Sequence, residues 1–361
     1  MGASRRLGWR VKGAIAVGIL GVIGLIGALV ALAGARAIDH RVQALLSDTN
    51  TRPNNWTDWS AWNGQRATLL HVTDTRTLVV DDVWYGEAPG TEDLERIGSF
   101  ASMDSIEVQD EDAAGDGKYI APSRLLAFTP WDFQLHGGLA IVATDRVFEC
   151  YYDPDNHNND MGYRGRENGL YAVGSLADVK ARALHIREVH RVFDEVKARR
   201  RLDLLDAFLR SHIGPARYDA IDTLKASPDL ALRLFRAFLS DDEHLDGRPQ
   251  AVLGLRVLPV SGVAHELALA LEHELVFWEK VAPTLPALWR TTQGNLGQSV
   301  RRHYSVTCLI LDGMSEHNDD SCREPVRRFL AVKKGMPPDG DDSRTLDRAC
   351  ERAQRLVLDK R

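Results

Sequence analysis

Cysteine is scarce in this chain of 361 residues, which contains only Cys150, Cys308, Cys322 and Cys350. The sequence has neither a CxxC pair nor a Cys/His cluster at zinc spacing, which excludes the common structural zinc motifs. In an oxidising compartment, four cysteines permit two disulfides in any of three pairings, and a Cys308–Cys322 bridge would stabilise the fold by about 3 kcal/mol. The alternative is a set of small buried thiols, which is favoured by the apolar helical face that Cys350 shares with Val357.

Motifs for nucleotide binding and for covalent catalysis are also missing. The chain contains no GxxxxGK[ST] and no strand-placed GxGxxG, so nothing in it predicts a phosphate-binding loop. The tripeptide His136-Gly137-Gly138 is similar to the oxyanion loop of esterases, but the chain has no GxSxG nucleophile elbow for it to serve. We interpret the tripeptide as a turn before a strand from Leu139 to Ala143. The sequence therefore predicts a protein that is not an enzyme and that holds no cofactor.

Basic residues are outnumbered by acidic ones, with 45 Lys+Arg against 51 Asp+Glu. Four of the cations, Arg5, Arg6, Arg10 and Lys12, lie at the amino terminus, so the rest of the chain carries a net charge of −10. An acidic body excludes nucleic acid as a partner, because phosphate binding requires a basic face.

Charge is absent from the 23 residues between Lys12 and Arg36. A helix of that length spans a bilayer core of about 30 Å, and cations before it favour a cytoplasmic amino terminus. The sequence therefore predicts a single-pass protein that contacts the membrane through a signal anchor at 13–37, after a basic flank at 1–12, with an extracytoplasmic body (periplasmic in a bacterium). A cleaved secretory signal is the alternative, because Ala35-Arg36-Ala37 is similar to a small-x-small cleavage site.

Glycine recurs at every third residue of this uncharged run, at Gly18, Gly21, Gly24 and Gly27. Small residues at such spacing let two helices approach closely. The run therefore permits a homodimer, and a purely structural envelope tether that acts through it is one hypothesis for the whole protein.

Tryptophan recurs at Trp56, Trp59 and Trp62, which places three indoles on one side of a helix. We expect this helix, in a segment at 38–65, to cap the core of the next domain, because that much apolar area is best buried against other apolar side chains. A belt at a membrane surface is the alternative.

Apolar residues between 94 and 108 follow the spacing LxxLxxLxxLxxLxL, at Leu94, Ile97, Phe100, Met103, Ile106 and Val108. Similar LxL segments occur at Thr77–Asp81 and at Arg124–Phe128, 28 residues earlier and 20 residues later. The pattern resembles the leucine-rich repeat, whose period is about 20–29 residues. The resemblance covers residues 66–190. The alternative is a small α+β domain with one amphipathic helix, Thr91–Ser102, packed on a short sheet.

The leucine-rich-repeat resemblance implies a concave face lined by the residues that flank the inward-facing pairs: Thr77, Val79, Asp81, Ser105, Glu107 and Gln109. Concave surfaces of repeat proteins typically carry binding. The sequence therefore predicts a protein-interaction scaffold without catalytic activity, whose partner is another protein of the cell envelope. Charge reversal at Asp81 and Glu107 is expected to abolish capture of that partner.

From about residue 177 the apolar period changes to 3.6, which is typical of helices. Expected helix starts near residues 215, 228, 248, 261, 285 and 297 make alternate helices recur every 33 to 37 residues. Over about 198–315 this pitch is similar, in period only, to the helical-hairpin solenoids of the HEAT and tetratricopeptide type; a compact bundle is the alternative. The predicted fold class is thus a transmembrane helix, an α/β domain at 66–190 and an all-α domain at 191–333, with a linker and terminal helix at 334–361.

Three clusters contain residue types that bind metals. The loop Asp153–Asp160 alternates acids and a histidine but lacks the glycine and glutamate of an EF-hand loop. His265, Glu272 and Glu279 recur every seven residues on one face of a helix, without an HExxH motif, and a smaller cluster occupies His185–His190. We predict no metal site; an envelope metal-dependent hydrolase that uses the loop or the His265 face is the alternative function.

Overall fold

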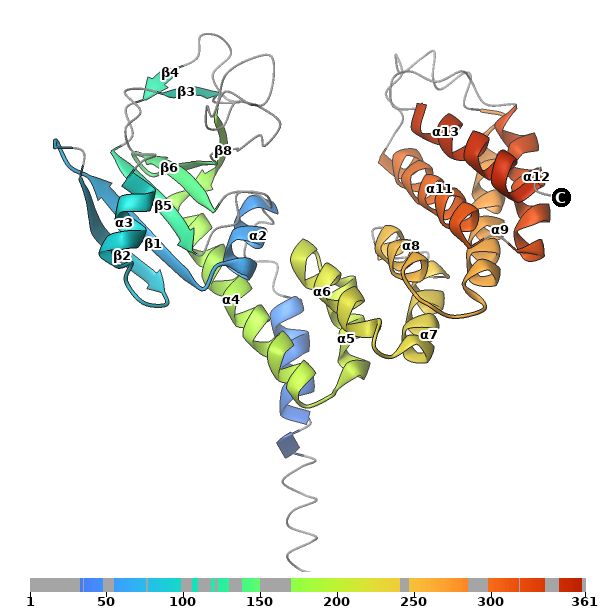
Figure 1. Cartoon of the computed structure of the whole chain (residues 1–361), viewed down its shortest axis with the longest axis horizontal. Helices are drawn as coiled ribbons and strands as arrows, with labels where there is room; N and C mark the ends of the chain where they lie inside the picture. The colour runs from blue at the N-terminus through green and yellow to red at the C-terminus, as the bar shows by residue number, and fades with distance from the viewer. Residues whose placement is uncertain are drawn as a thin grey trace, which may run out of the picture. The chain divides into compact units, whose positions relative to one another are not determined.

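The structure is a computed structural model that describes residues 33–34, 36–47, 55–75, 77–98, 106–109, 118–120, 123–129, 138–149, 170–240, 247–284, 298–317, 319–334 and 344–358. The chain divides into two compact units, Met1–Ala207 and Phe208–Arg361, and each is described by itself. The elements of both are labelled in Figure 1. The described chain is mostly helical, with one sheet in the first unit.

The sheet of the first unit has the strand order β2-β1-β5-β6-β7-β8-β3-β4. The strands are β1 (Arg66–Val72), β2 (Leu78–Tyr85), β3 (Ile106–Gln109), β4 (Lys118–Ile120), β5 (Arg124–Thr129), β6 (Leu139–Ala143), β7 (Arg146–Glu149) and β8 (Leu170–Ser175). All neighbours pair antiparallel except β3 and β8, which are parallel. The strand expected over Leu139–Ala143 is confirmed as β6.

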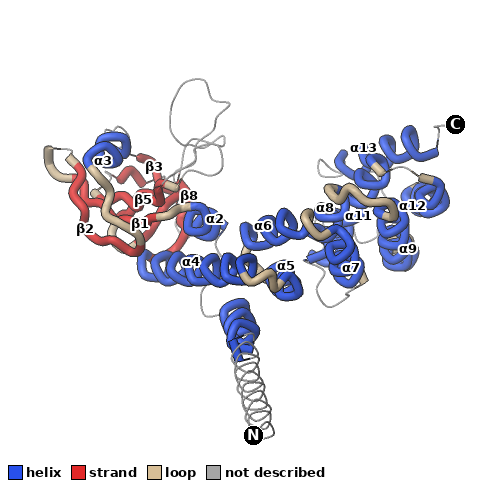
Figure 2. The backbone as a smooth tube through the Cα atoms, turned by 60° about the horizontal axis from the view of Figure 1, so that its bottom comes forward, coloured by secondary structure: helices blue, strands red, loops and turns tan. Residues whose placement is uncertain are grey.

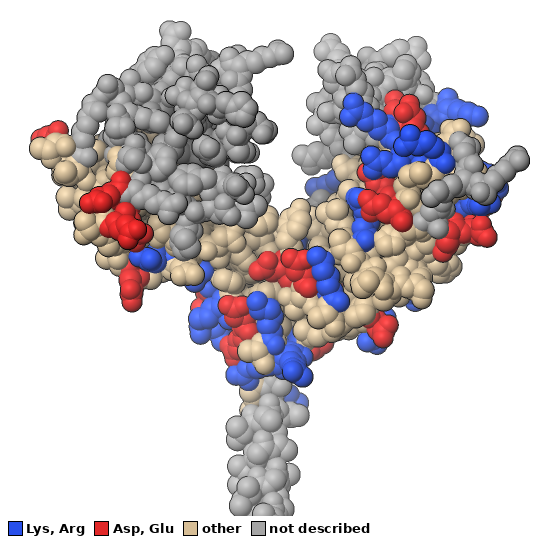
Figure 3. All heavy atoms as spheres, in the orientation of Figure 1, with Lys and Arg blue, Asp and Glu red and all other residues tan. Residues whose placement is uncertain are grey.

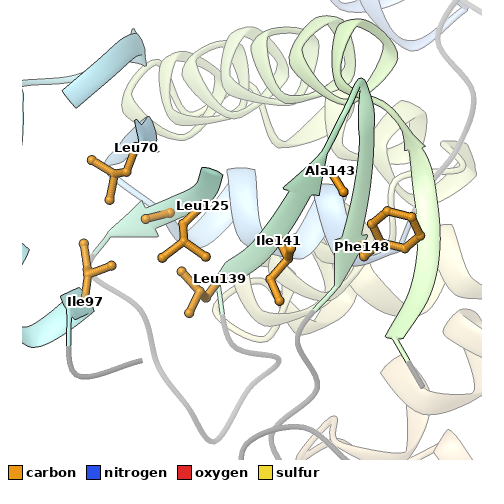
Figure 4. Close-up of a cluster of buried hydrophobic side chains, with 8 residues drawn as sticks. Leu70, Ile97, Leu125, Leu139, Ile141, Ala143 and Phe148 are labelled. Atoms are coloured by element: carbon orange, nitrogen blue, oxygen red, sulfur yellow. The ribbon is translucent and has the colours of Figure 1, made fainter. Parts of the chain in front are cut away.

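One face of the sheet carries a buried apolar cluster (Figure 4). Alternation along the strands points Leu70, Leu125 and Ile141 to this face, since successive side chains of a strand point to opposite sides. Helix α3 (Thr91–Gly98) adds Ile97, which is 1 % exposed, to the same cluster. The helix expected over Thr91–Ser102 is therefore present up to Gly98, and it packs on the sheet.

Helices α2 (Asn55–Asn63) and α4 (Leu176–Ala198) cover the opposite face of the sheet, as Figure 2 shows for α4. Trp56 of α2 makes an edge-to-face contact with Phe128 of β5, at 5.5 Å between ring centroids. Trp62 packs against Phe193 of α4, at 5.6 Å. Trp56 and Trp62 thus bury apolar area against the sheet and α4, which is the contact that a cap requires.

Helix α4 is the longest described helix, and its start is fixed by a side-chain cap. The Ser175 hydroxyl accepts from the backbone N–H of Asp178, which satisfies one of the helix's free amino-terminal donors. The helical segment 36–46 packs against α4, since its Arg41 donates to both Glu188 and Glu195 at 2.9 Å. The predicted domain boundary at residues 190 and 191 falls within this helix.

The second unit is entirely helical in its described part. Two short elements follow α4 before or across the unit boundary: η1 (Leu202–Leu204) and α5 (Leu205–Arg210). The remaining elements are α6 (Gly214–Leu224), α7 (Pro228–Leu239), α8 (Arg248–Arg256), α9 (Val263–Val281), α11 (Gln298–Glu316), η3 (Asp320–Cys322), α12 (Arg323–Lys333), α13 (Arg344–Ala353) and a final π-helical turn, η5 (Gln354–Leu358). The expected starts near residues 215, 228, 248, 261 and 297 lie within two residues of those of α6, α7, α8, α9 and α11, whereas residue 285 lies outside the described residues.

Proline and glycine explain two features of these helices. Pro215, Pro228 and Pro249 occupy the first turns of α6, α7 and α8, where the missing N–H costs no helical hydrogen bond. Gly254 of α8 faces the Phe235 ring of α7 so closely that a Cβ atom would lie 2.3 Å from a ring carbon. The two helices therefore pack at a distance that only glycine allows.

The similarity to helical-hairpin solenoids remains a prediction.

The predicted transmembrane helix is not supported. Within the ranges given above, no helix is long and apolar enough to cross a membrane. Most of the segment 13–37, including the glycines proposed for a homodimer, lies outside the described residues. The predicted single-pass, extracytoplasmic location depended on that helix and is corrected with it.

The leucine-rich-repeat prediction is wrong. Consecutive repeats would place the strands of Thr77–Asp81, Ile106–Val108 and Arg124–Phe128 next to one another. These segments do lie in β2, β3 and β5, but no two of these strands are neighbours, and β2 and β5 both pair antiparallel with β1. Spacing alone misled us because LxL is also the inward alternation of an ordinary antiparallel strand.

The Cys308–Cys322 bridge that the sequence permits is not formed. Cys308, Cys322 and Cys350 are buried thiols, as the alternative expected, and Cys150 lies outside the described residues. Burial raises the pKa of the Cys322 thiol, which makes it unreactive.

Candidate functional site

The edge of the sheet at β2 is the candidate functional site. Among the described strands, β2 is terminal in the sheet order and pairs only with β1. A tight turn holds the two together: the Thr73 N–H donates to the Thr77 carbonyl at 2.9 Å, and the two hydroxyls lie 2.6 Å apart. The backbone of β2 is thus fixed on one side by β1 and has no described strand on the other.

Two irregularities in the β1–β2 register give this edge its shape. Leu70 and Leu69 of β1 pair with Val80 and Asp82, so Asp81 is an extra residue that bulges from the strand. A second shift makes Trp84 an extra residue in the same way. Bulges re-aim side chains and increase the local twist, and they are among the devices by which edge strands limit uncontrolled pairing.

The inward and outward faces of β2 differ sharply. Leu78 and Val80 pack against the apolar cluster that contains Ile97. Between them, Val79 is 51 % exposed, and Asp81 is also exposed. The strand therefore presents one apolar and one acidic side chain to solvent beside the backbone edge that pairs with no strand in the described ranges.

Acidic residues dominate the segment that contains the edge. Between residues 71 and 98 the sequence has only two arginines but seven carboxylates: Asp74, Asp81, Asp82, Glu87, Glu92, Asp93 and Glu95. Asp82 pairs with Lys180 of α4 at 2.6 Å, and Asp93 pairs with Arg66 of β1 at 3.0 Å. Figure 3 shows acidic side chains over the β1, β2 and α3 part of this unit.

The predicted partner-binding residues are only partly brought together. Thr77, Val79 and Asp81 follow one another on β2 or immediately before it. Glu107 and Gln109 lie on β3, and β1, β5, β6, β7 and β8 separate that strand from β2 in the sheet order. Ser105 lies outside the described residues. The six residues therefore do not line one concave face, and the three at β2 remain as the candidate.

The predicted metal candidates do not form a described site. His265, Glu272 and Glu279 all lie on the exposed face of α9, and Glu279 pairs with Arg328 of α12 at 2.9 Å. Nowhere in the described ranges do three or more His, Cys, Asp or Glu side chains converge in a way that could hold a metal. The loop Asp153–Asp160 lies outside these ranges.

The cluster at His185–His190 joins elements of the fold. Hydrogen bonds from Arg191 and Arg41 to Glu188 hold the pKa of that carboxyl below its ordinary value. His190 Nδ1 lies 3.0 Å from Arg187 Nη1, and the Arg187 guanidinium stacks 5.1 Å from the centre of the Tyr85 ring. Burial raises the pKa of Tyr85, whose hydroxyl donates to the Ala61 carbonyl at 3.5 Å. This arrangement connects α4 to β2.

Two buried charge networks were not foreseen from the sequence. In the first unit, Asp58 of α2 pairs with Arg182 of α4, and both are at least 95 % buried. In the second, Glu274 of α9 lies 2.9 Å from Arg248 of α8 and 2.8 Å from His303 of α11. The sequence signal that could have revealed these networks is a charged residue within an otherwise apolar helical stripe. These groups are removed from solvent and bonded to each other. They therefore hold helices together and are not accessible to a substrate.

Comparison of the chain with protein-family models, with characterised proteins and with solved structures finds no match in any of the three.

Proposed function

We propose that this protein is a non-catalytic interaction protein and that it binds another protein through the β2 edge, at Thr77, Val79 and Asp81. The observation that carries the proposal is the position of β2 at the end of the sheet, with Val79 half exposed. An unpaired strand edge offers a row of backbone donors and acceptors that an extended segment of a partner can use.

The rest of the described chain supports a binding rather than a catalytic role. Its buried ionisable groups, such as Asp58 and Glu274, are engaged in ion pairs between helices. Charged residues used in this way hold elements in register, whereas an active site leaves its acid or base accessible to a substrate.

The experiment places a photo-crosslinking amino acid at position 79 of the full chain, in the cells that normally make it. We expect one reproducible adduct, with the crosslink mapped by mass spectrometry to position 79 and to a single segment of the partner. The same amino acid at Leu184, an exposed apolar position on α4 of the same unit, serves as the control and should not give that adduct.

Charge reversal then tests the site itself. Asp81→Lys should remove the adduct at position 79, whereas Glu351→Lys, on the exposed face of α13, should leave it unchanged. The proposal is wrong if no discrete adduct forms at position 79, or if the adduct survives Asp81→Lys.

A further inference from the structure

We infer that the segment bound at β2 is an extended, basic stretch of polypeptide, which adds to the sheet as a further strand. This inference rests on the proposed function and names the chemistry of the partner. It depends on two properties of the edge: one backbone side of β2 pairs with no described strand, and Asp81 is exposed on it.

The backbone side fixes the conformation of the partner. β2 already has the extended geometry of a paired strand, because β1 holds it from Val72↔Leu78 to Ala67↔Tyr85. A helix cannot satisfy the alternating N–H and C=O groups of such an edge, but an extended chain can. The occupant is therefore a strand.

The charge fixes the composition of the partner. A strand laid beside β2 lies next to the exposed Asp81. Two of the seven carboxylates between residues 71 and 98, Asp82 and Asp93, are already in ion pairs, so the charge preference rests on Asp81 itself. Opposite charges on adjacent strands stabilise pairing, and like charges destabilise it. Lysine or arginine is thus favoured opposite Asp81, and an apolar side chain is favoured beside the exposed Val79.

The same charge disfavours a second copy of this chain as the occupant. A two-fold pairing of β2 with itself would bring both acid-rich segments together, without a cation to compensate Asp81. Together with the bulges at Asp81 and Trp84, this is how a sheet edge avoids uncontrolled self-pairing. Pairing of β2 with a second copy is therefore disfavoured, and pairing with a basic strand is favoured.

The direct test uses a labelled peptide, Lys-Thr-Val-Thr-Lys-Thr-Val, with the full-length protein, and measures binding by fluorescence anisotropy. In an extended strand the lysine and valine side chains of this peptide alternate along one face, as Asp81 and Val79 do on β2. Two N-methylated forms of the peptide carry the methyl groups on alternate residues, one set on the odd and one on the even positions. Only alternate N–H groups of an added strand face its neighbour. One form should therefore lose at least about tenfold in affinity and the other should retain binding.

Three controls separate strand addition from simple charge attraction. The charge-mirrored peptide, with glutamate in place of lysine, should not bind. Asp81→Asn should weaken binding of the basic peptide severalfold, whereas Glu351→Gln, which removes the same charge from α13, should not. Near-ultraviolet circular dichroism checks that both variants are folded, and hydrogen exchange should show new protection of β2 amides when the peptide is bound.

Equal binding of the two N-methylated forms, or no binding of the basic peptide, would overturn the inference. If the crosslinked adduct at position 79 still forms in that case, the partner binds at this edge in another conformation and only the inference fails. If the peptide behaves as expected but no adduct forms in cells, the inference about the edge stands and the proposed function fails.

Discussion

The guanidinium of Arg182 donates to both carboxylate oxygens of Asp58, from Nε at 2.6 Å and from Nη2 at 2.8 Å. The two side chains are 5 % and 1 % exposed, so this bidentate pair joins α4 to α2 almost out of contact with solvent. Two short hydrogen bonds in parallel fix the rotation of the helices as well as their distance.

Arg182→Met is expected to destabilise the first unit by about 3–5 kcal/mol, because it leaves the Asp58 carboxylate buried without its cation. Replacing both partners, as Arg182→Met with Asp58→Leu, should restore most of that loss. Hydrogen exchange of α2 and α4 amides measures the free energy of opening. Lys197→Met breaks an exposed pair with Asp194 on α4 itself and should cost less than about 1 kcal/mol in the same measurement. An effect of Lys197→Met equal to that of Arg182→Met would contradict the interpretation.

Glu274→Gln is expected to destabilise the packing of α8, α9 and α11 by about 3 kcal/mol, because the buried Arg248 would lose its ion pair with the Glu274 carboxylate. Glu266→Gln is the matched control on the same helix. Glu266 is as buried as Glu274, but its partner Arg236 is 57 % exposed and can be solvated. The free energy of unfolding, measured by hydrogen exchange of α9 amides in denaturant, should fall much more for Glu274→Gln than for Glu266→Gln.

Asp81→Val is expected to make the protein self-associate at micromolar concentration. The substitution replaces the exposed acid of the β2 edge with a β-branched apolar side chain, which removes the charge that opposes edge-to-edge pairing. Sedimentation velocity across a dilution series measures the association. Glu351→Val adds the same side chain to an exposed position of α13, and if it associated equally, exposed hydrophobicity rather than the strand edge would be the cause.

Glu316 should make stability depend on pH in a predictable direction. Hydrogen bonds from Arg256 hold the pKa of Glu316 below its ordinary value of 4.5. The ionised carboxyl therefore contributes stability above pH 4.5, and this contribution disappears as the pH falls through the lower pKa of the folded state. Because the side chain is 45 % exposed, we expect less than about 1 kcal/mol.

The measurement compares wild type with Glu316→Gln from pH 6 to pH 3. The difference in the free energy of unfolding should shrink toward acid pH, and 0.5 M salt should reduce it at pH 6. A difference that stays constant with pH would show that the Arg256 contact acts through packing alone.

The buried thiols should be protected in the folded protein. Cys308, Cys322 and Cys350 are each expected to react with a thiol reagent only after unfolding in denaturant, and peptide mapping by mass spectrometry identifies the modified positions. A disulfide-linked peptide containing Cys308 and Cys322 in the native protein would contradict the structure.

Local signals in the sequence predicted much of the helical unit. Pro228 after Ser227, and Gly214 before Pro215, mark helix starts through backbone chemistry that acts within a few residues. The tryptophan cap was also readable, because three indoles on one side of a helix must be buried somewhere. These features can be predicted without knowing which distant residues they contact.

The sheet could not be predicted in the same way, because its order depends on pairings far apart in sequence. The LxL pattern of β2, β3 and β5 is compatible with adjacent repeats and with the observed antiparallel order. Only the register of β1 against both β2 and β5 decides between them, and periodicity carries no information on register. For the same reason Glu107 was assigned to the same surface as Asp81.

The buried pairs were missed for a related reason. Arg182 lies on the same buried face of α4 as Val179 and Ile186, and its burial is compatible with that face because Asp58 neutralises it. A charge within an apolar stripe indicates a buried ion pair, but a single sequence does not identify the partner that lies 124 positions away.

The distance along the chain between α2 and α4 has a consequence for biosynthesis. The 124 residues between Asp58 and Arg182 take about 6 to 25 seconds to translate at about 5–20 residues per second. Throughout that interval the indoles of Trp56 and Trp62 leave the ribosome without the helix that later covers them. Until α4 emerges, Trp62 lacks the Phe193 ring on which it packs in the folded protein, and that apolar area stays exposed on the nascent chain.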